Sequence, residues 1–145
     1  MAFRFPLAIL LRFRQSVERR EELALQRISH EIVQCQRKID QLDARIAEAE
    51  RARTEALKQP ISAFQLQSML SDARLAVESR RTLIDLLVPL EKKRIEQLAV
   101  YQAALRDRKI LSELESKRLE AYKIEKERTQ QKQVDDIFAA RAHRS

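Results

Sequence analysis

Few residues of this chain belong to the types that carry catalysis or hold a metal ion. His30 and His143 are far apart in the sequence, and neither lies at a spacing typical of metal ligands. The single cysteine, Cys35, excludes an internal disulfide and falls within an apolar repeat, where a thiol packs as a small hydrophobic group. The carboxylates alternate with Lys and Arg at helical spacing, as in ion pairs on a solvated helix surface. We therefore predict a protein that is not an enzyme, with no catalytic residue, no metal site and no cofactor.

The 145 residues contain no glycine, and this excludes several kinds of site. Phosphate-binding loops, dinucleotide-binding turns and nucleophile elbows use glycine where the backbone takes a positive φ or closely approaches a phosphate. Two-residue β-hairpins also depend on it, so a multi-stranded β fold is not expected. With 35% charged and 5% aromatic residues, the composition favours long helices and coiled coils.

The elements that carry these residues are predicted from a repeat of apolar side chains in steps of four and three. Between residues 7 and 56 the repeat places apolar side chains at 11 of 15 positions, and between residues 25 and 49 it has no exception. A period of 3.5 predicts a helix with one coiled-coil seam. Three early exceptions are polar, namely Arg14, Glu18 and Glu21. We expect the seam to rotate there onto neighbouring apolar residues that are seven apart: Leu10, Val17 and Ala24.

A corner is predicted at Pro60, because proline disfavours helix in the residue before it and Ser62 then offers a capping hydroxyl. A second apolar repeat follows, and its first members are Leu66, Leu70, Ala73, Val77, Arg80, Ile84 and Leu87. A bend or short break of the helix is expected at Pro89. The predicted parts are arm one at about 3–58, a corner at about 59–62, arm two at about 62–140 and a frayed tail at 141–145.

Two long helices joined by one corner must cover each other's seams. The predicted fold is all-α, a long antiparallel two-helix coiled-coil hairpin that forms a single elongated domain. A turn near residue 60 places Leu7 opposite Glu113. The last two dozen residues of arm two then overhang as a lone helix; the alternative is that the register slips and this segment folds back on the hairpin.

The net charge of +7 comes entirely from the two ends of the chain. Residues 1–20 hold five basic and one acidic residue, and residues 117–145 hold eight basic and five acidic residues. An antiparallel hairpin would bring these segments together and make one end basic. The alternative is that they are merely solvated helix faces rich in arginine.

Two binding classes other than a protein partner remain open. The N-terminal phenylalanines, Phe3, Phe5 and Phe13, alternate with arginines, so nucleic-acid bases or an anionic membrane surface are possible ligands. No recognition motif accompanies them, and no nucleic acid is expected as the partner. No apolar run approaches the roughly 18 residues of a membrane span, so a cytoplasmic protein without a transmembrane segment is predicted.

Two end segments of the chain have distinctive motifs. Residues 3–14 contain Phe-Arg-Phe-Pro-Leu and then Leu-Leu-Arg-Phe-Arg, and residues 131–141 contain Gln-Lys-x-x-Asp-Asp and then Ala-x-Arg. In these motifs the chain resembles the FliJ family of flagellar type III export proteins. The proline corner in mid-chain also matches. The stalk of a virulence-type III secretion system is similar in size and is the nearest alternative.

The resemblance implies a coiled coil similar to the gamma-subunit stalk of F1-type ATPases. It implies a cytoplasmic protein, peripherally associated with the inner membrane at the flagellar base. Its terminal end would enter the hexameric export ATPase, its tip would reach the membrane export gate, and it would escort export chaperones. Residues matching the family ending are expected to contact the ATPase ring: Gln131, Lys132, Asp135, Asp136, Ala140 and Arg141. The expected gate-binding residues at the tip are Phe64, Leu66, Met69, Leu70 and Ala73, of which Phe64 and Met69 lie off the predicted seam.

Overall fold

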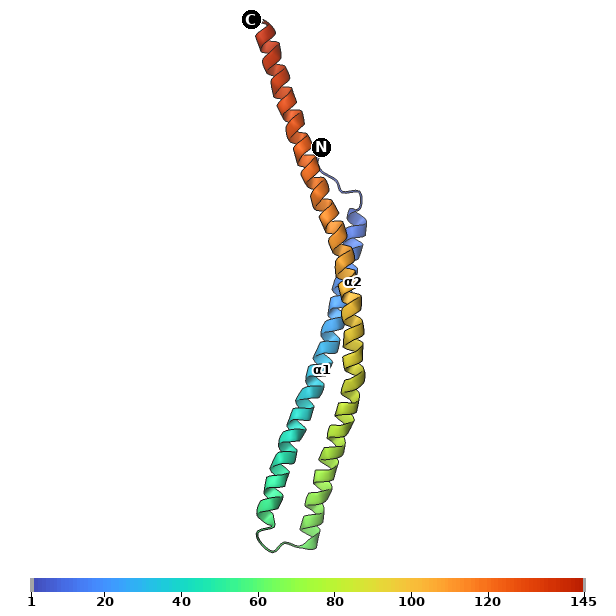
Figure 1. Ribbon diagram of the computed structural model, residues 1–145, viewed down its shortest axis with the longest axis vertical. Helices are drawn as coiled ribbons and strands as arrows, with labels where there is room; N and C mark the ends of the chain where they lie inside the picture. The colour runs from blue at the N-terminus through green and yellow to red at the C-terminus, as the bar shows by residue number, and fades with distance from the viewer. Residues whose placement is uncertain (1, 145) are drawn as a thin grey trace. The chain divides into compact units, whose positions relative to one another are not determined.

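The computed structural model describes residues 2–144, and these residues form two helices and no strand. Helix α1 spans Ala8–Ala56 (49 residues) and helix α2 spans Ala63–Arg144 (82 residues). The two helices pack against each other in opposite directions, with the corner at residues 57–62 (Figure 1). The all-α two-helix hairpin is therefore confirmed.

The helix bounds depart from the prediction mainly at the two ends of the chain. Helix α1 begins at Ala8, because the segment before it is not helical and packs against α2. Helix α2 continues to Arg144, past the predicted end of arm two at about residue 140, and Ser145 lies outside the described residues. Pro89 lies inside α2, so of the expected bend or short break the break is not observed. The ring removes only one backbone hydrogen bond from a helix that continues on both sides.

The corner is closed by a reciprocal pair of hydrogen bonds at the start of α2. The backbone N–H of Gln65 donates to Ser62 Oγ at 3.1 Å, and the backbone N–H of Ser62 donates to Gln65 Oε1 at 3.3 Å. This is a capping box, which satisfies two donors that a helix start otherwise leaves unpaired. No described residue has a positive φ, so the corner forms without a residue in the left-handed region and needs no glycine.

Replacing Ser62 with alanine is expected to lower the free energy of unfolding by about 1 kcal/mol, because the Gln65 N–H loses its acceptor. Urea unfolding followed by circular dichroism at 222 nm measures the change. Ser71→Ala is the matched control, since Ser71 is exposed inside α2 and alanine favours helix there. Equal losses in both variants would contradict a capping role for Ser62.

Contacts divide the described residues into two units: residues 21–100, and residues 2–20 with 101–144. In the first unit, the core of α1 is formed by Ile32, Cys35 and Ile39, all buried. The Cys35 thiol donates to the carbonyl oxygen of Leu83 on α2 at 3.3 Å. The prediction that Cys35 is a buried core residue is thus confirmed.

The second unit has its own apolar core at the chain's N-terminal end. Phe5, Leu11 and Leu111 are buried together, and Leu7 and Leu114 pack against them. Leu7 was predicted to lie opposite Glu113, so the predicted register agrees with the observed contacts to within about one helical turn.

The predicted seam of α1 is observed along its whole length, including its polar exceptions. Every position of the repeat from Leu7 to Ala56 is buried or half-buried. Arg14 forms an ion pair with Asp107 at 3.4 Å in the second unit. In the first unit, the Gln97 side-chain amide donates to Glu21 Oε2 at 2.6 Å. Polar partners on α2 hold these side chains in the interface. Of the apolar residues onto which the seam was predicted to rotate, Val17 and Ala24 are also half-buried, whereas Leu10 is exposed.

Glu18 forms a well-shielded ion pair with Arg108 in the seam. The Arg108 guanidinium donates to both carboxylate oxygens, from Nε at 2.6 Å and from an Nη at 3.2 Å. Only 17% of the Glu18 side chain and 26% of the Arg108 side chain are exposed. The hydrogen bond to Glu18 raises the pKa of Arg108 above its ordinary value, against a smaller lowering by desolvation.

The seam of α2 differs from the prediction at two of its first seven positions. One row of half-buried positions in residues 66–97 alternates in steps of three and four: Leu66, Met69, Ala73, Ala76, Arg80, Leu83, Leu87, Leu90, Arg94 and Gln97. Ile84, a predicted member, and Glu91 are half-buried beside this row. The predicted members Leu70 and Val77 are exposed instead. The predicted repeat had mixed two neighbouring apolar rows of one helix, of which only one faces α1.

Candidate partner-binding surfaces

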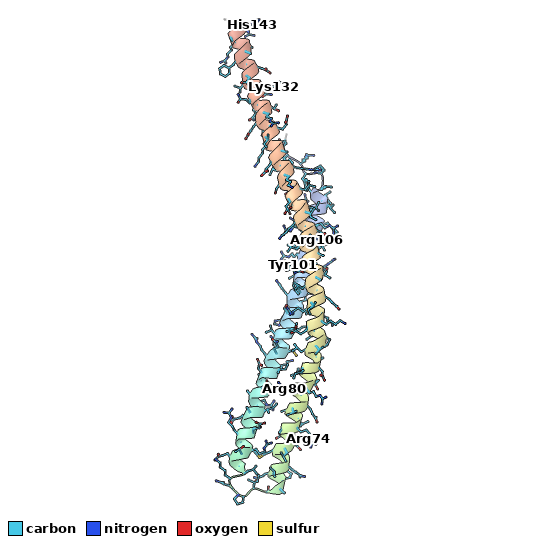
Figure 2. All side chains as sticks on the ribbon, viewed as in Figure 1. Arg74, Arg80, Tyr101, Arg106, Lys132 and His143 are labelled. Atoms are coloured by element: carbon cyan, nitrogen blue, oxygen red, sulfur yellow. The ribbon has the colours of Figure 1, made fainter. Side chains whose placement is uncertain are left out.

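The last part of α2 is the more extensive candidate surface, and we call residues 123–144 the terminal stretch. Every residue in it is exposed. No other described segment runs beside it in Figure 1, and Figure 2 shows Lys132 and His143 on this stretch. The predicted overhang is therefore observed, and the alternative in which it folds back on the hairpin is not.

All six residues predicted to contact an ATPase ring lie in the terminal stretch and are exposed: Gln131, Lys132, Asp135, Asp136, Ala140 and Arg141. The Gln131 side-chain amide donates to Asp135 Oδ1 at 3.1 Å, one turn further along the helix. Val134, Ile137 and Phe138 are exposed among them. The stretch thus presents apolar side chains bordered by both signs of charge, as helices that bind a partner do.

An aromatic anchor defines where the terminal stretch begins. The ring of Phe3 lies 5.5 Å from that of Tyr122, centroid to centroid. The Arg118 guanidinium lies 5.8 Å from the centre of the Phe5 ring, a cation–π distance. These contacts hold residues 3–7 against α2 just before residue 123, where the fully exposed terminal stretch begins. The sequence pattern had not indicated this anchoring role for Tyr122.

The two basic end segments of the sequence belong to the same unit. Residues 1–20 and 101–145 together hold 16 basic and 9 acidic residues, whereas residues 21–100 hold 13 of each. The whole net charge of +7 is therefore carried by the unit that contains the terminal stretch. The prediction that the two basic end segments come together is confirmed, in that both belong to one unit.

The N-terminal phenylalanines do not form one stacking surface. Phe5 is buried and Phe3 is half-buried, both against α2, while Phe13 is exposed. Arg14 is engaged by Asp107, and its guanidinium lies 5.9 Å from the centre of the Phe13 ring. One exposed ring is a poor platform for successive nucleic-acid bases.

The second candidate surface is the tip, at the start of α2. Phe64 has 79% of its surface exposed, the largest value for a phenylalanine of this chain. A hollow of about 400 Å³ lies beside it and is lined by Ala56, Ile61, Phe64, Gln65, Ser68 and Met69. Ala56 is the last position of the α1 repeat and Ile61 follows the proline corner, so the turn is what brings these two residues together at the tip.

Two of the predicted tip residues have the opposite burial from the one expected. Met69 was expected to be exposed but is half-buried, and Leu70 was assigned to the seam but is exposed. Leu66 and Ala73 are half-buried in the seam, as the repeat predicted. The residues that the tip offers to a partner are therefore Phe64 and Leu70, with Met69 lining the hollow.

Residues 2–144 show no group of three or more His, Cys, Asp or Glu side chains that could hold a metal ion. None of the helices in the same residues is long and apolar enough to cross a membrane. Comparison with protein-family models, curated proteins and solved structures finds no match for this chain.

Proposed function

We propose that this chain is a stalk component, without enzymatic activity, of the flagellar type III protein export apparatus. Its terminal stretch inserts into the hexameric export ATPase and promotes assembly and activity of the ring. Its tip contacts the membrane export gate, and the chain also escorts export chaperones. It acts in the cytoplasm, at the cytoplasmic face of the inner membrane. The same role in a virulence-type III system is the nearest alternative.

The observation that carries the proposal is the exposed terminal stretch in the unit that holds all the net positive charge. A single helix is about 10–12 Å wide, so it enters an opening about half as wide as two packed helices need. Its apolar side chains provide contact area inside such an opening. Its basic surroundings attract an acidic lining over about one Debye length, roughly 8–10 Å at physiological ionic strength.

The tip supports the second contact of the proposal. Phe64 and Leu70 are apolar, exposed and next to the corner, where a partner reaches them without separating the two helices. Aromatic side chains at exposed positions are frequent anchors of protein interfaces. The tip and the terminal stretch belong to different units, so the two contacts involve separate parts of the chain.

The test is to add the purified protein to the type III export ATPase of the same organism and to measure hexamer formation and ATP hydrolysis. Lys132→Glu with Arg141→Glu is expected to reduce the stimulation about tenfold, because two charge contacts are reversed. The matched control is Lys123→Glu with Arg128→Glu, which makes the same charge change on the same exposed stretch, outside the predicted contact residues. The control is expected to keep most of the stimulation.

Absence of any stimulation by the unmodified protein would exclude the stalk proposal. Equal loss in both charge-reversed variants would mean that the attraction is nonspecific. Retention of a fluorescent RNA by the unmodified protein, with no effect on the ATPase, would instead favour a nucleic-acid binder, which the net charge of +7 also permits.

A further inference from the structure

The closed end of the hairpin lies in the longest stretch of the chain without a charged side chain. Residues 59–71 include no Lys, Arg, Asp or Glu, although these types make up 35% of the chain. We call these 13 residues the uncharged segment. It comprises the later part of the corner and the first nine residues of α2, and it belongs wholly to the unit of residues 21–100 (Figure 1). The surface at this end of the unit is therefore almost free of charge.

Large apolar side chains are exposed at the same end. In the uncharged segment, Phe64 is 79% and Leu70 is 47% exposed, and Leu57, two residues before the segment, is 55% exposed. Leu57 and Phe64 lie on opposite sides of the corner, and Leu70 lies about 9 Å further along α2. Phenylalanine and leucine are usually buried. Their exposure together, at an end without charges, indicates a surface that meets apolar surroundings.

The backbone of the corner is already provided with hydrogen bonds. The capping box of Ser62 and Gln65 pairs two N–H groups at the start of α2. The N–H groups that follow α1 donate to carbonyl oxygens about one turn earlier, at 2.9–3.3 Å: Leu57 to Arg53, Lys58 to Glu55 and Gln59 to Ala56. Unpaired backbone groups are what makes non-helical chain costly in lipid. This corner can therefore enter apolar surroundings without leaving these five donors unpaired.

The charges nearest to the uncharged segment are placed so that a bilayer surface accepts them. Asp72 is the first charged residue of α2, and the nine residues before it in the helix rise by about 13 Å. Proteins on a membrane surface bury apolar side chains only about 5–10 Å deep, so the charges of α2 stay outside when this end meets the bilayer. On the other side of the corner, Lys58 is paired with Glu55 at 3.1 Å. Its long side chain keeps the ammonium group at the level of the lipid headgroups.

Other occupants fit this end less well. A stable interface with a second copy takes about 20–30 residues from each partner, which is more than the 13 residues of the uncharged segment. A nucleic acid needs cations to neutralise its phosphates, and the segment has none. A bilayer surface requires neither a matching shape nor opposite charges, and it accepts a small convex apolar end.

We propose that the uncharged segment rests on a lipid bilayer, with Phe64, Leu57 and Leu70 inserted at the boundary between headgroups and acyl chains. Burial of these side chains drives the contact, so it does not require anionic lipid. The contact is weak and reversible, because even a whole myristoyl chain gives only marginal membrane binding. The inference goes beyond the stalk proposal, since it assigns the lipid itself as a ligand of the tip. Its test uses neither the ATPase nor the export gate, so either proposal can fail alone.

The experiment uses the full-length protein, which has no tryptophan, so that Phe64→Trp introduces a single fluorescent reporter at the tip. The probe is phosphatidylcholine vesicles at physiological ionic strength, because anionic vesicles would attract the basic unit of the chain. The tryptophan emission is expected to shift to shorter wavelength as lipid is added. The matched control is Phe13→Trp, at a side chain that is 58% exposed in the other unit. Its emission is expected to stay unchanged.

Leu57→Ser with Phe64→Ser is expected to lower the partitioning into these vesicles about tenfold, measured by flotation, because two inserted side chains are lost. The matched control is Leu75→Ser with Leu86→Ser, which changes side chains that are 61% and 53% exposed in the same unit but outside the uncharged segment. This control is expected to partition as the unmodified protein does. Circular dichroism checks that both variants keep their helix content.

Four results would overturn the proposal. One is an unchanged emission of Phe64→Trp at saturating lipid, and another is equal loss of partitioning in the two serine variants. A third is binding only to phosphatidylglycerol vesicles at low salt, with equal shifts at residues 64 and 13, since the net charge would then cause it. The fourth is a dimer, seen by sedimentation equilibrium, that disappears in Leu57→Ser, Phe64→Ser, since the segment would then bind a second copy.

Discussion

Removal of residues 123–145 is expected to abolish stimulation of the export ATPase while leaving the thermal unfolding midpoint of the remaining hairpin nearly unchanged. The described residues of this segment are all exposed, and the anchor formed by Phe3 and Tyr122 remains in the shortened chain. The segment extends a helix that is already nucleated, so its own contribution to stability is close to zero. Differential scanning calorimetry measures the midpoint, and ATP hydrolysis by the ring measures the function.

A full-length variant with Val134→Ser and Phe138→Ser tests whether the apolar side chains, and not the length of the terminal stretch, account for the effect of the truncation. It retains the length and charge of the terminal stretch but loses two exposed apolar side chains. We expect it to stimulate the ATPase about tenfold less than the unmodified protein, because burial of those two side chains drives insertion. A shortened chain that still stimulates the ring would show that the terminal stretch is not the ATPase contact. A large fall in its unfolding midpoint would show that the stretch stabilises the hairpin.

Replacing Arg108 with alanine is expected to lower the free energy of unfolding by about 1–3 kcal/mol, the largest effect among the ion pairs. The substitution leaves the Glu18 carboxylate without its two guanidinium donors while it remains mostly shielded from water. Arg14→Ala is the matched control, because the Arg14–Asp107 pair is more exposed and longer, at 3.4 Å. That variant is expected to lose less than about 1 kcal/mol.

The double variant Glu18→Leu, Arg108→Leu separates the cost of an unpaired charge from the value of the pair. The double variant places apolar side chains at both positions of the ion pair, and we expect its stability to equal or exceed that of the unmodified protein. Urea unfolding of the two single variants and the double variant gives the coupling energy between the positions. A double variant as unstable as Arg108→Ala would contradict this account.

The pH dependence of the Arg108 contribution has a definite sign. The pKa of Arg108 is raised by its hydrogen bond to Glu18, so the folded state holds this proton more tightly than the unfolded state. The stability that Arg108 contributes is fully present below its ordinary pKa and is lost only as pH rises through the raised value. Arg108 therefore adds no loss of stability between neutral and moderately alkaline pH.

The apolar repeat of α1 determined its packing face because the helix has only one such face. Ile28, Ile32, Cys35 and Ile39 follow a single line, and the structure has them all buried or half-buried. The polar members of the same line were predicted to leave the interface, since the sequence does not show which side chains across it will pair with them. Asp107 and Arg108 supply those partners only after α2 has packed in this register.

Helix α2 was harder to interpret because two apolar rows lie next to each other on it. Met69 and Leu70 are adjacent in sequence and similarly apolar, so periodicity alone gives no reason to bury one and expose the other. The structure half-buries the row that contains Met69 and leaves most of the neighbouring row, including Leu70, Val77 and Val88, exposed. For the same reason, Met69 was predicted to be exposed at the tip and Leu70 to lie in the seam, whereas the structure has the reverse.

By itself, the sequence determined that this protein is a pair of helices with one corner near Pro60, and that its net charge resides at the ends of the chain. Local causes are sufficient for these features: the absence of glycine, a 3.5-residue period, a proline and a capping serine. Only the tertiary structure decided which row of α2 faces α1, which polar residues the seam accepts, and where α2 becomes a lone helix. The packing row of α2 and the polar residues of the seam depend on which side chains, far apart in sequence, come into contact in this register. The start of the lone helix depends on where residues 3–7 are anchored on α2.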